Sequence, residues 1–164
     1  MTEKSINKEV LCEKIIARLK ADYALLLQAA KTAHAAATHD ENIPDNKYAT
    51  LGLEASYLAQ GQANRAQEIL QVIQVFQQLP LLAFSAKSLI RLTAVVQLED
   101  DEGRIRLVFL GPAAGGLLVE LDEVVLMIIT PASPLGRELI GKQCGDLVEL
   151  KGDASREYEI ISIC

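Results

Sequence analysis

The chain has 164 residues, which suits one compact domain or two small ones. Half of the residues are hydrophobic, but only 4% are aromatic and none is tryptophan. This composition disfavours aromatic platforms for single-stranded nucleic acid and pockets lined by several rings. The 16 basic and 22 acidic residues give a net charge of −6, which disfavours direct binding to duplex nucleic acid.

The cysteines and the apolar runs indicate a reducing, non-membrane environment. Cys12, Cys144 and Cys164 lack the spacing of a zinc site or of a disulfide framework. The first residues are polar and charged, and no apolar run approaches the roughly 20 residues that cross a bilayer. We therefore expect a soluble, unsecreted, cytoplasmic protein that makes no membrane contact.

The first half of the chain has the apolar rhythm of a coiled coil, with alternating spacings of three and four residues. A short polar segment, residues 38–46, divides the pattern into two helical segments. Because so short a connection returns the chain along itself, an antiparallel helical hairpin with its tip at 38–46 is predicted. The predicted seam, interrupted by two polar positions, consists of Cys12, Ile16, Leu19, Tyr23, Leu26, Ala30, Ala33 and Ala37, then Tyr48, Leu51, Ala55, Leu58, Gln62, Arg65, Ile69, Val72, Phe76 and Leu79.

The periodicity changes at Pro80, which stops the second helix. Beyond it, short alternating apolar runs separated by turn residues predict strands. We therefore predict residues 1–79 as the coiled-coil hairpin, 80–91 as a linker and 92–164 as a second domain.

The second domain is predicted to be a small antiparallel β domain. An acidic turn between residues 92–99 and 104–110 indicates a β-hairpin. Ser133 before Pro134 has the pattern of an N-cap followed by proline at the first helical position, which predicts one short helix. The fold class is therefore α+β. Further strands are expected at 117–120, 124–129, 147–150 and 157–163.

Acidic residues concentrate at the predicted tip. Asp40, Glu41 and Asp45 offer carboxylate oxygens, which are the ligands that Mg²⁺ prefers. The alternative is that these residues only solvate a loop, as polar residues commonly do. No Ser, Cys or His is placed by the sequence for nucleophilic catalysis, so we expect no catalytic residue and no cofactor of the chain's own.

A series of short motifs runs through residues 129–160. In order and spacing they resemble the C-terminal domain of the Gre (GreA/GreB) bacterial transcription elongation factors. Residues 96–103 also resemble the opening hairpin of that domain. The motifs are Ser133-Pro134, Arg137-Glu138-Leu139, Gly141-Lys142, Gly145-Asp146 and Tyr158-Glu159-Ile160.

The resemblance implies a sheet like that of FK506-binding proteins and a role on RNA polymerase. The C-terminal domain would dock on the rim of the polymerase's secondary channel, and the coiled coil would enter the channel. The tip would help to hold the second Mg²⁺ of the polymerase active site, where the polymerase itself cleaves RNA. The chain would be an accessory factor, not an enzyme, and would meet nucleic acid only within the elongation complex. The docking loop would hold Ser133, Pro134, Leu135 and Arg137.

The tip departs from the family pattern, which has an Asp seven residues and a Glu four residues before the Tyr that opens the second helix. Counted back from Tyr48, these positions are Glu41 and Pro44, so only the neighbouring Asp45 can replace the second carboxylate. Two interpretations follow. The chain either modulates elongation or transcript cleavage, or it occupies the channel without stimulating cleavage and competes with factors that do.

Two further classes remain as alternatives. One is a coiled-coil interaction module unrelated to polymerase. The other is a peptidyl-prolyl isomerase, which only the implied fold suggests. Isomerisation needs a ring-lined apolar pocket, and the second domain offers just Phe109 and Tyr158 beyond the boundary residue Phe84. The isomerase is therefore disfavoured.

Overall fold

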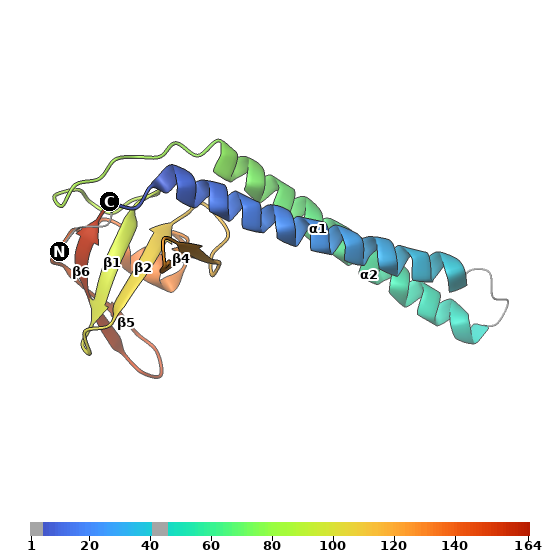
Figure 1. The fold of residues 1–164 in the computed structure, drawn as a ribbon. Coiled ribbons are helices and arrows are strands. Elements are labelled where there is room, and N and C mark those ends of the chain that lie inside the picture. The colour runs from blue at the N-terminus through green and yellow to red at the C-terminus, as the bar shows by residue number, and fades with distance from the viewer. Residues whose placement is uncertain (1–4, 41–45) are drawn as a thin grey trace. The chain divides into compact units, whose positions relative to one another are not determined.

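The computed structural model describes residues 5–40 and 46–164, and it describes side chains for residues 5–36 and 56–164. The chain divides into two compact units (Figure 1). One unit comprises residues 15–77, and the other combines the residues up to Lys14 with Gln78–Cys164. Within the ranges that the structure describes, no helix is both long and apolar enough to cross a membrane.

Two long helices form the first unit. Helix α1 spans Lys8–Asp40 and helix α2 spans Asn46–Gln77, and they lie side by side in opposite directions (Figure 1). The side-chain oxygen of Asn7 accepts hydrogen bonds from the backbone of Glu9 at 3.0 Å and of Val10 at 3.2 Å, which caps the start of α1. Helix α2 ends before Pro80. The predicted antiparallel helical hairpin is confirmed.

Among the side chains of α2 that the structure describes, the seam differs from the predicted one at Leu58 and Arg65. Leu58 is 57% exposed and Arg65 is also exposed, whereas Gln62 and Ile69 are half-buried and Phe76 is buried as predicted. The spacing of four and three was therefore assigned in the wrong order. Ala59 and Ala66 are less exposed than Leu58 and Arg65 before them, and Ile73 is buried next to the half-buried Val72.

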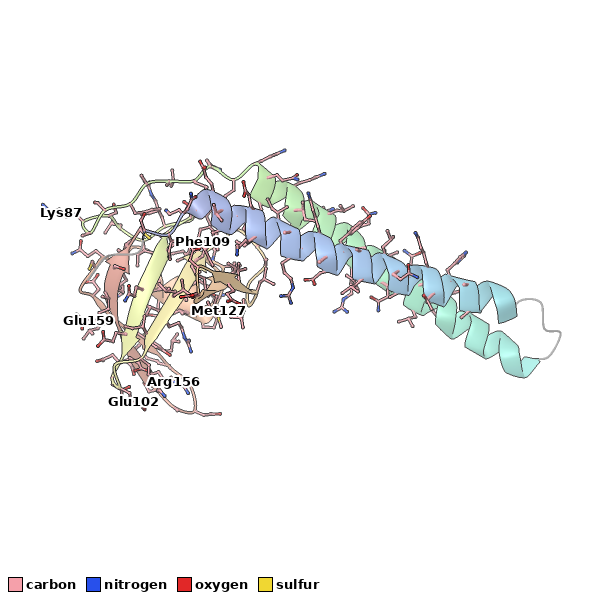
Figure 2. All side chains as sticks on the ribbon, in the orientation of Figure 1. Lys87, Glu102, Phe109, Met127, Arg156 and Glu159 are labelled. Atoms are coloured by element: carbon pink, nitrogen blue, oxygen red, sulfur yellow. The ribbon has the colours of Figure 1, made fainter. Side chains whose placement is uncertain are left out.

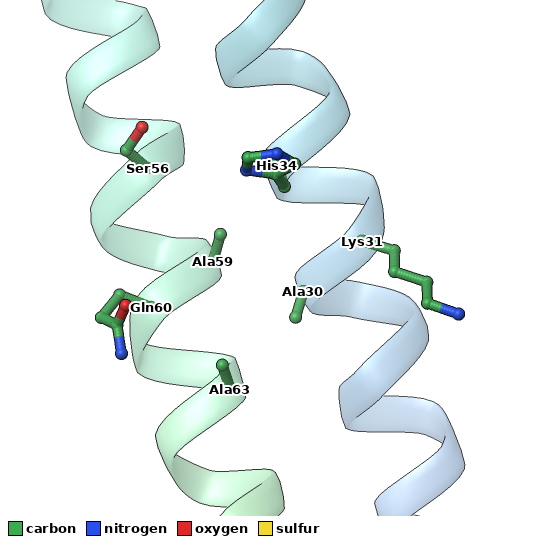
Figure 3. A pocket seen from close by; sticks show the side chains of 7 residues that line it. All are labelled: Ala30, Lys31, His34, Ser56, Ala59, Gln60 and Ala63. Atoms are coloured by element: carbon green, nitrogen blue, oxygen red, sulfur yellow. The ribbon is translucent and has the colours of Figure 1, made fainter.

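Small side chains leave a hollow of about 460 Å³ between the helices (Figure 3). Ala30 faces Ala59 and Ala63 across it, while Lys31 points away from α2. Large side chains are buried elsewhere in the same unit, at Ile15, Leu19, Ile73 and Phe76. Because tertiary packing supplies most helix stability, the end of the pair with these large residues is the more strongly held.

A six-stranded sheet with one short helix forms the second unit. Its elements are β1 Val95–Asp100, β2 Ile105–Leu110, β3 Leu118–Leu121, β4 Val124–Ile129, α3 Pro134–Leu139, β5 Leu147–Leu150 and β6 Arg156–Ile163. The strand order is β3-β4-β2-β1-β6-β5. The predicted β domain is confirmed, with the correction that β2 and β4 run parallel while the other neighbours are antiparallel. After β2 the chain forms β3 at the edge of the sheet and returns as β4 between β3 and β2, which makes β4 parallel to β2.

Apolar side chains cover both faces of the sheet. Leu98, Ile160 and Leu139 of α3 belong to one buried cluster. Successive strand residues point to opposite faces, and Val95 and Phe109 are also fully buried on the other side. Burial on both faces explains the continuous apolar run of β4.

The first turns of α1 belong to this unit. The ammonium group of Lys8 donates a hydrogen bond to the carbonyl of Leu82 at 2.7 Å and lies 4.4 Å from the ring centre of Phe84. Burial lowers the pKa of Lys8. The ammonium group of Lys14 donates to the carbonyl of Glu120 at 3.1 Å. Leu11, between the two lysines, is fully buried.

The predicted linker, residues 80–91, contributes to the core. Ile90 is buried in the cluster that includes α3. The backbone nitrogen of Ile90 donates a hydrogen bond to the carbonyl of Lys142 at 2.8 Å. The carbonyl of Ile90 accepts one from the backbone nitrogen of Gly141 at 2.9 Å. These bonds connect the segment before β1 to the end of α3.

The β1–β2 turn is organised by one carboxylate. The Asp100 carboxylate accepts hydrogen bonds from the backbone nitrogens of Glu102 at 3.0 Å and Arg104 at 2.9 Å, and from Nε of Arg104 at 2.8 Å. The bond from the Arg104 backbone, followed by the one from its side chain, holds the pKa of Asp100 below its usual value.

The corrected seam predicts unequal effects of two alanine substitutions in α2. Ile73→Ala should lower the free energy of unfolding by about 2–4 kcal/mol, because it leaves a cavity between the helices. Leu58→Ala should change it by less than about 0.5 kcal/mol, because Leu58 is exposed. Urea unfolding followed by far-ultraviolet circular dichroism measures both. Equal losses would contradict the corrected seam.

The turn predicts a pH-dependent contribution to stability. Because the pKa of Asp100 is lowered by folding, its charged form stabilises the fold above the unfolded pKa, and this contribution is lost as the pH falls through the folded pKa. Arg104→Gln should raise the titration midpoint of Asp100 in carboxyl-carbon NMR. An unchanged midpoint would show that the side chain of Arg104 does not lower this pKa, because the backbone donor is kept in the variant.

Candidate functional site

The loop between β4 and α3 is closed by the hydroxyl of Ser133. Its oxygen accepts a hydrogen bond from the backbone nitrogen of Gly136 at 3.0 Å, and its O–H donates to the carbonyl of Thr130 at 2.7 Å. Ser133 is in the extended region, at φ −67° and ψ 154°, and Pro134 begins the helix with its ring already set for helical φ. The predicted N-cap and proline start are both present.

Gly136 allows the loop to approach the first turn of α3. A β-carbon at this position would overlap the carbonyl oxygen of Thr130 and would lie 2.9 Å from the Ser133 hydroxyl oxygen. Only glycine therefore fits without moving the loop. No structural role was predicted for Gly136, although it lies between the Ser133-Pro134 and Arg137-Glu138-Leu139 motifs.

The four predicted docking residues do not share one environment. Pro134 and Arg137 are exposed, and they are neighbours three residues apart on the helix. Ser133 is half-buried and uses its hydroxyl within the loop. Leu135 is only 7% exposed and belongs to the core cluster, where it helps to hold α3 on the sheet, and its predicted contact with a partner stays a prediction. We call the exposed residues Ala132, Pro134 and Arg137 the docking face.

The predicted tip cluster is not described as a unit. Asp40 is the last residue of α1, and its side chain is outside the described part, as are Glu41 and Asp45 altogether. The magnesium role of these three residues stays a prediction. Among the side chains that the structure describes, no group of three or more His, Cys, Asp or Glu is placed to hold a metal ion.

The cysteines and the rings of the second unit have ordinary environments. Cys12 is buried, and this burial raises the pKa of its thiol, which keeps the thiol neutral. The S–H group of Cys144 donates to the carbonyl of Ile161 at 2.9 Å. Phe109 is fully buried and Tyr158 is nearly so. These two rings therefore do not form the open ring-lined pocket that an isomerase requires.

Support for a family comes from the unit that contains the sheet, which we call the C-terminal unit. The family model described as "Transcription elongation factor, GreA/GreB, C-term" matches residues 86–164. Residues 86–164 therefore form a GreA/GreB C-terminal domain. The match starts inside the segment predicted as a linker, in agreement with the burial of Ile90. The predicted resemblance of this domain to the Gre factors is confirmed, and the helical N-terminus precedes it in the chain as predicted.

Solved structures resemble the chain along much of its length. Gfh1 of Thermus aquaticus is 26% identical, with 92% of each chain covered and a TM-score of 0.40. GreA factor homolog 1 of Thermus thermophilus is 25% identical, with 91% of this chain and 94% of that one covered and a TM-score of 0.39. GreA/GreB of Nitrosomonas europaea is 13% identical, with 58% and 77% covered and a TM-score of 0.37. Because these TM-scores are below 0.5, the family assignment depends on the C-terminal domain.

The comparison with curated protein sequences gives no match.

The close approach at Gly136 predicts opposite effects at two glycines. Gly136→Ala should lower the free energy of unfolding of the C-terminal unit by about 1–3 kcal/mol, because the new methyl group displaces the Thr130 loop. Gly61→Ala, which meets open space in helix α2, should raise the stability of the helix pair by about 0.5–1 kcal/mol. Urea unfolding monitored by amide NMR peaks of each unit separates the two. A neutral Gly136→Ala would contradict the packing.

Proposed function

We propose that this chain is an accessory factor of transcription that binds RNA polymerase through its C-terminal domain. In this role the helical hairpin enters the secondary channel and modulates elongation or transcript cleavage. The GreA/GreB C-terminal domain at residues 86–164 supports a role in transcription, and the capped Ser133-Pro134 loop is the single structural observation that supports the docking site. The role implies a cytoplasmic location and contact with nucleic acid only within the elongation complex.

The docking face is suited to a specific contact because its backbone is held before binding. The hydroxyl of Ser133 makes two hydrogen bonds, and the ring of Pro134 fixes the start of α3. A rigid loop loses little conformational freedom on association, so more of the contact energy is available for binding. Arg137 offers an exposed cation beside the apolar Pro134, a combination that is common at interface centres.

The close packing of the two helices supports the proposed entry of the hairpin into a narrow channel. Ala30, Ala33 and Ala66 are buried between the helices, and side chains this small permit a close approach of the two backbones. Packing by alanine therefore gives the pair a smaller cross-section than packing by leucine or phenylalanine would.

The tip is proposed to act on the polymerase's own metal. Asp40, Glu41 and Asp45 are carboxylates, which fit a hard cation. A bound Mg²⁺ would stabilise negative charge on the reacting phosphate, and the chain would supply ligands without any cofactor of its own. Pro44 stands at one expected carboxylate position. This substitution favours the second interpretation, in which the hairpin occupies the channel without stimulating cleavage.

Binding to purified core RNA polymerase tests the docking face. Arg137→Ala and Pro134→Ala should each weaken binding about 5- to 30-fold, as expected for residues at an interface centre. Ser133→Ala should also weaken it by releasing the loop, whereas Ser133→Thr keeps the capping oxygen and should bind like the wild type. Arg91→Ala is the matched control, because Arg91 is an exposed arginine elsewhere in the same unit. Equal losses for Arg91→Ala and Arg137→Ala, or no binding by the wild type, would contradict the proposal.

RNA cleavage in stalled elongation complexes distinguishes the two interpretations of the tip. If the tip assists the metal, the wild type should stimulate cleavage, and Glu41→Ala or Asp45→Ala should abolish the stimulation. If the hairpin only occupies the channel, the wild type should slow elongation without stimulating cleavage, and both variants should do the same. Loss of stimulation in the Ser133→Ala variant but not in the tip variants would contradict a metal role for the tip.

A further inference from the structure

A polar pocket lies at the end of the sheet where the β1–β2 turn meets the start of β6. Its volume is about 330 Å³. Figure 2 shows Glu102 of the turn and Arg156 of β6 at this same end of the sheet. No step of the proposed function uses it. The pocket is lined by Asp100, Arg104, Ile105, Arg106, Arg156 and Tyr158.

Strand alternation gathers basic side chains on the pocket's face. Arg106 lies opposite Leu98, which is fully buried, so Arg106 is on the face of the sheet that carries the core. Arg156 shares that face with Tyr158, two residues further along β6. Four glutamates of the neighbouring strands occupy the other face, where Glu149 lies opposite Glu157 and Glu99 lies opposite Glu159, whereas Asp100 lies on the pocket's face.

Two of the three guanidinium groups have no carboxylate partner. Arg104 forms ion pairs with Asp100 at 2.8 Å and with Glu102 at 3.1 Å, so two carboxylates face this one cation and leave one negative charge against the two positive charges of Arg106 and Arg156. Arg106 lies 5.5 Å from the ring centre of the buried Tyr158, which restricts its motion. Within the described part of the chain, neither Arg106 nor Arg156 forms an ion pair. The pocket therefore carries excess positive charge.

We propose that this pocket binds a phosphate-bearing small anion, namely pyrophosphate or the polyphosphate tail of a nucleotide. Guanidinium groups offer paired donors that match phosphate oxygens, and a stacked arginine loses little freedom on binding. The volume is within the usual range for small-molecule pockets.

The charge around the pocket favours a small anion over a nucleic acid strand. Residues 85–164 contain 8 basic and 13 acidic residues, a net charge of −5. A long polyanion would extend beyond the pocket and meet the repulsion of this acidic unit, whereas a small anion stays against the arginines. The inference uses only the geometry of the sheet and is independent of any role on polymerase.

Isothermal titration of the full chain with pyrophosphate, in magnesium-free buffer, tests the proposal. The wild type should bind, and Arg156→Gln should weaken binding about tenfold, because each charge-assisted bond is worth about 1.5 kcal/mol or more. Arg106→Gln should do the same. The matched control is Arg91→Gln, an exposed arginine of the same unit outside the pocket, which should bind like the wild type.

Titrations with a nucleoside triphosphate and with single-stranded RNA then identify the class of ligand. A nucleoside triphosphate that binds more tightly than pyrophosphate would assign the pocket to a nucleotide, and equal binding would assign it to the phosphates alone. Because Arg106 packs on Tyr158, its variant is checked for folding by NMR, and the exposed Arg156 gives the decisive result. No binding at about 1 mM pyrophosphate, equal weakening by Arg91→Gln, or tighter binding of single-stranded RNA than of either small anion would overturn the proposal.

Discussion

The hydroxyl of Ser133 makes the interaction on which the candidate docking site depends. It accepts from Gly136 and donates to Thr130, so one side chain closes the loop after β4 and caps the helix that follows. The cap positions Pro134 and Arg137 at the surface, while Leu135 fastens the same turn to the core. Because the loop must approach the helix closely, the motif also needs glycine at position 136. The short motif is therefore a local folding device as well as a candidate contact surface.

The continuous helix α1 contributes to both units. Its first turns, up to Lys14, belong to the C-terminal unit, and its residues from Ile15 onward pack with α2. Lys8 and Lys14 bond to carbonyls of Leu82 and Glu120, and Leu11 is fully buried between them. Helix α3 packs in the core on one face of the sheet. The other face is also apolar and buried, at Val95 and Phe109. A truncation that ends before Lys14 would therefore remove part of the unit that contains the sheet, although the removed residues belong to helix α1.

The sequence predicted what depends on local periodicity. The heptad pattern predicted two antiparallel helices, and the Ser133-Pro134 pair predicted the start of α3. The same pattern predicted the wrong buried positions in α2, because it favours large apolar residues. Leu58 is exposed there, while the smaller Ala66 is buried. Strand patterns do not specify pairing partners, so the parallel pairing of β2 and β4 was not predictable. The arginine pocket was missed because its residues come together only when β2 and β6 join the same sheet.

The central claim is that the C-terminal domain docks through the face formed by Ala132, Pro134 and Arg137. Hydrogen–deuterium exchange of the full chain, measured with and without core RNA polymerase, tests it most directly. We expect slower exchange on binding at residues 130–140 and at the predicted hairpin tip, 38–46, with little change at the β1–β2 turn. Protection confined to the β1–β2 turn, or no protection at residues 130–140 in a chain that binds, would contradict it.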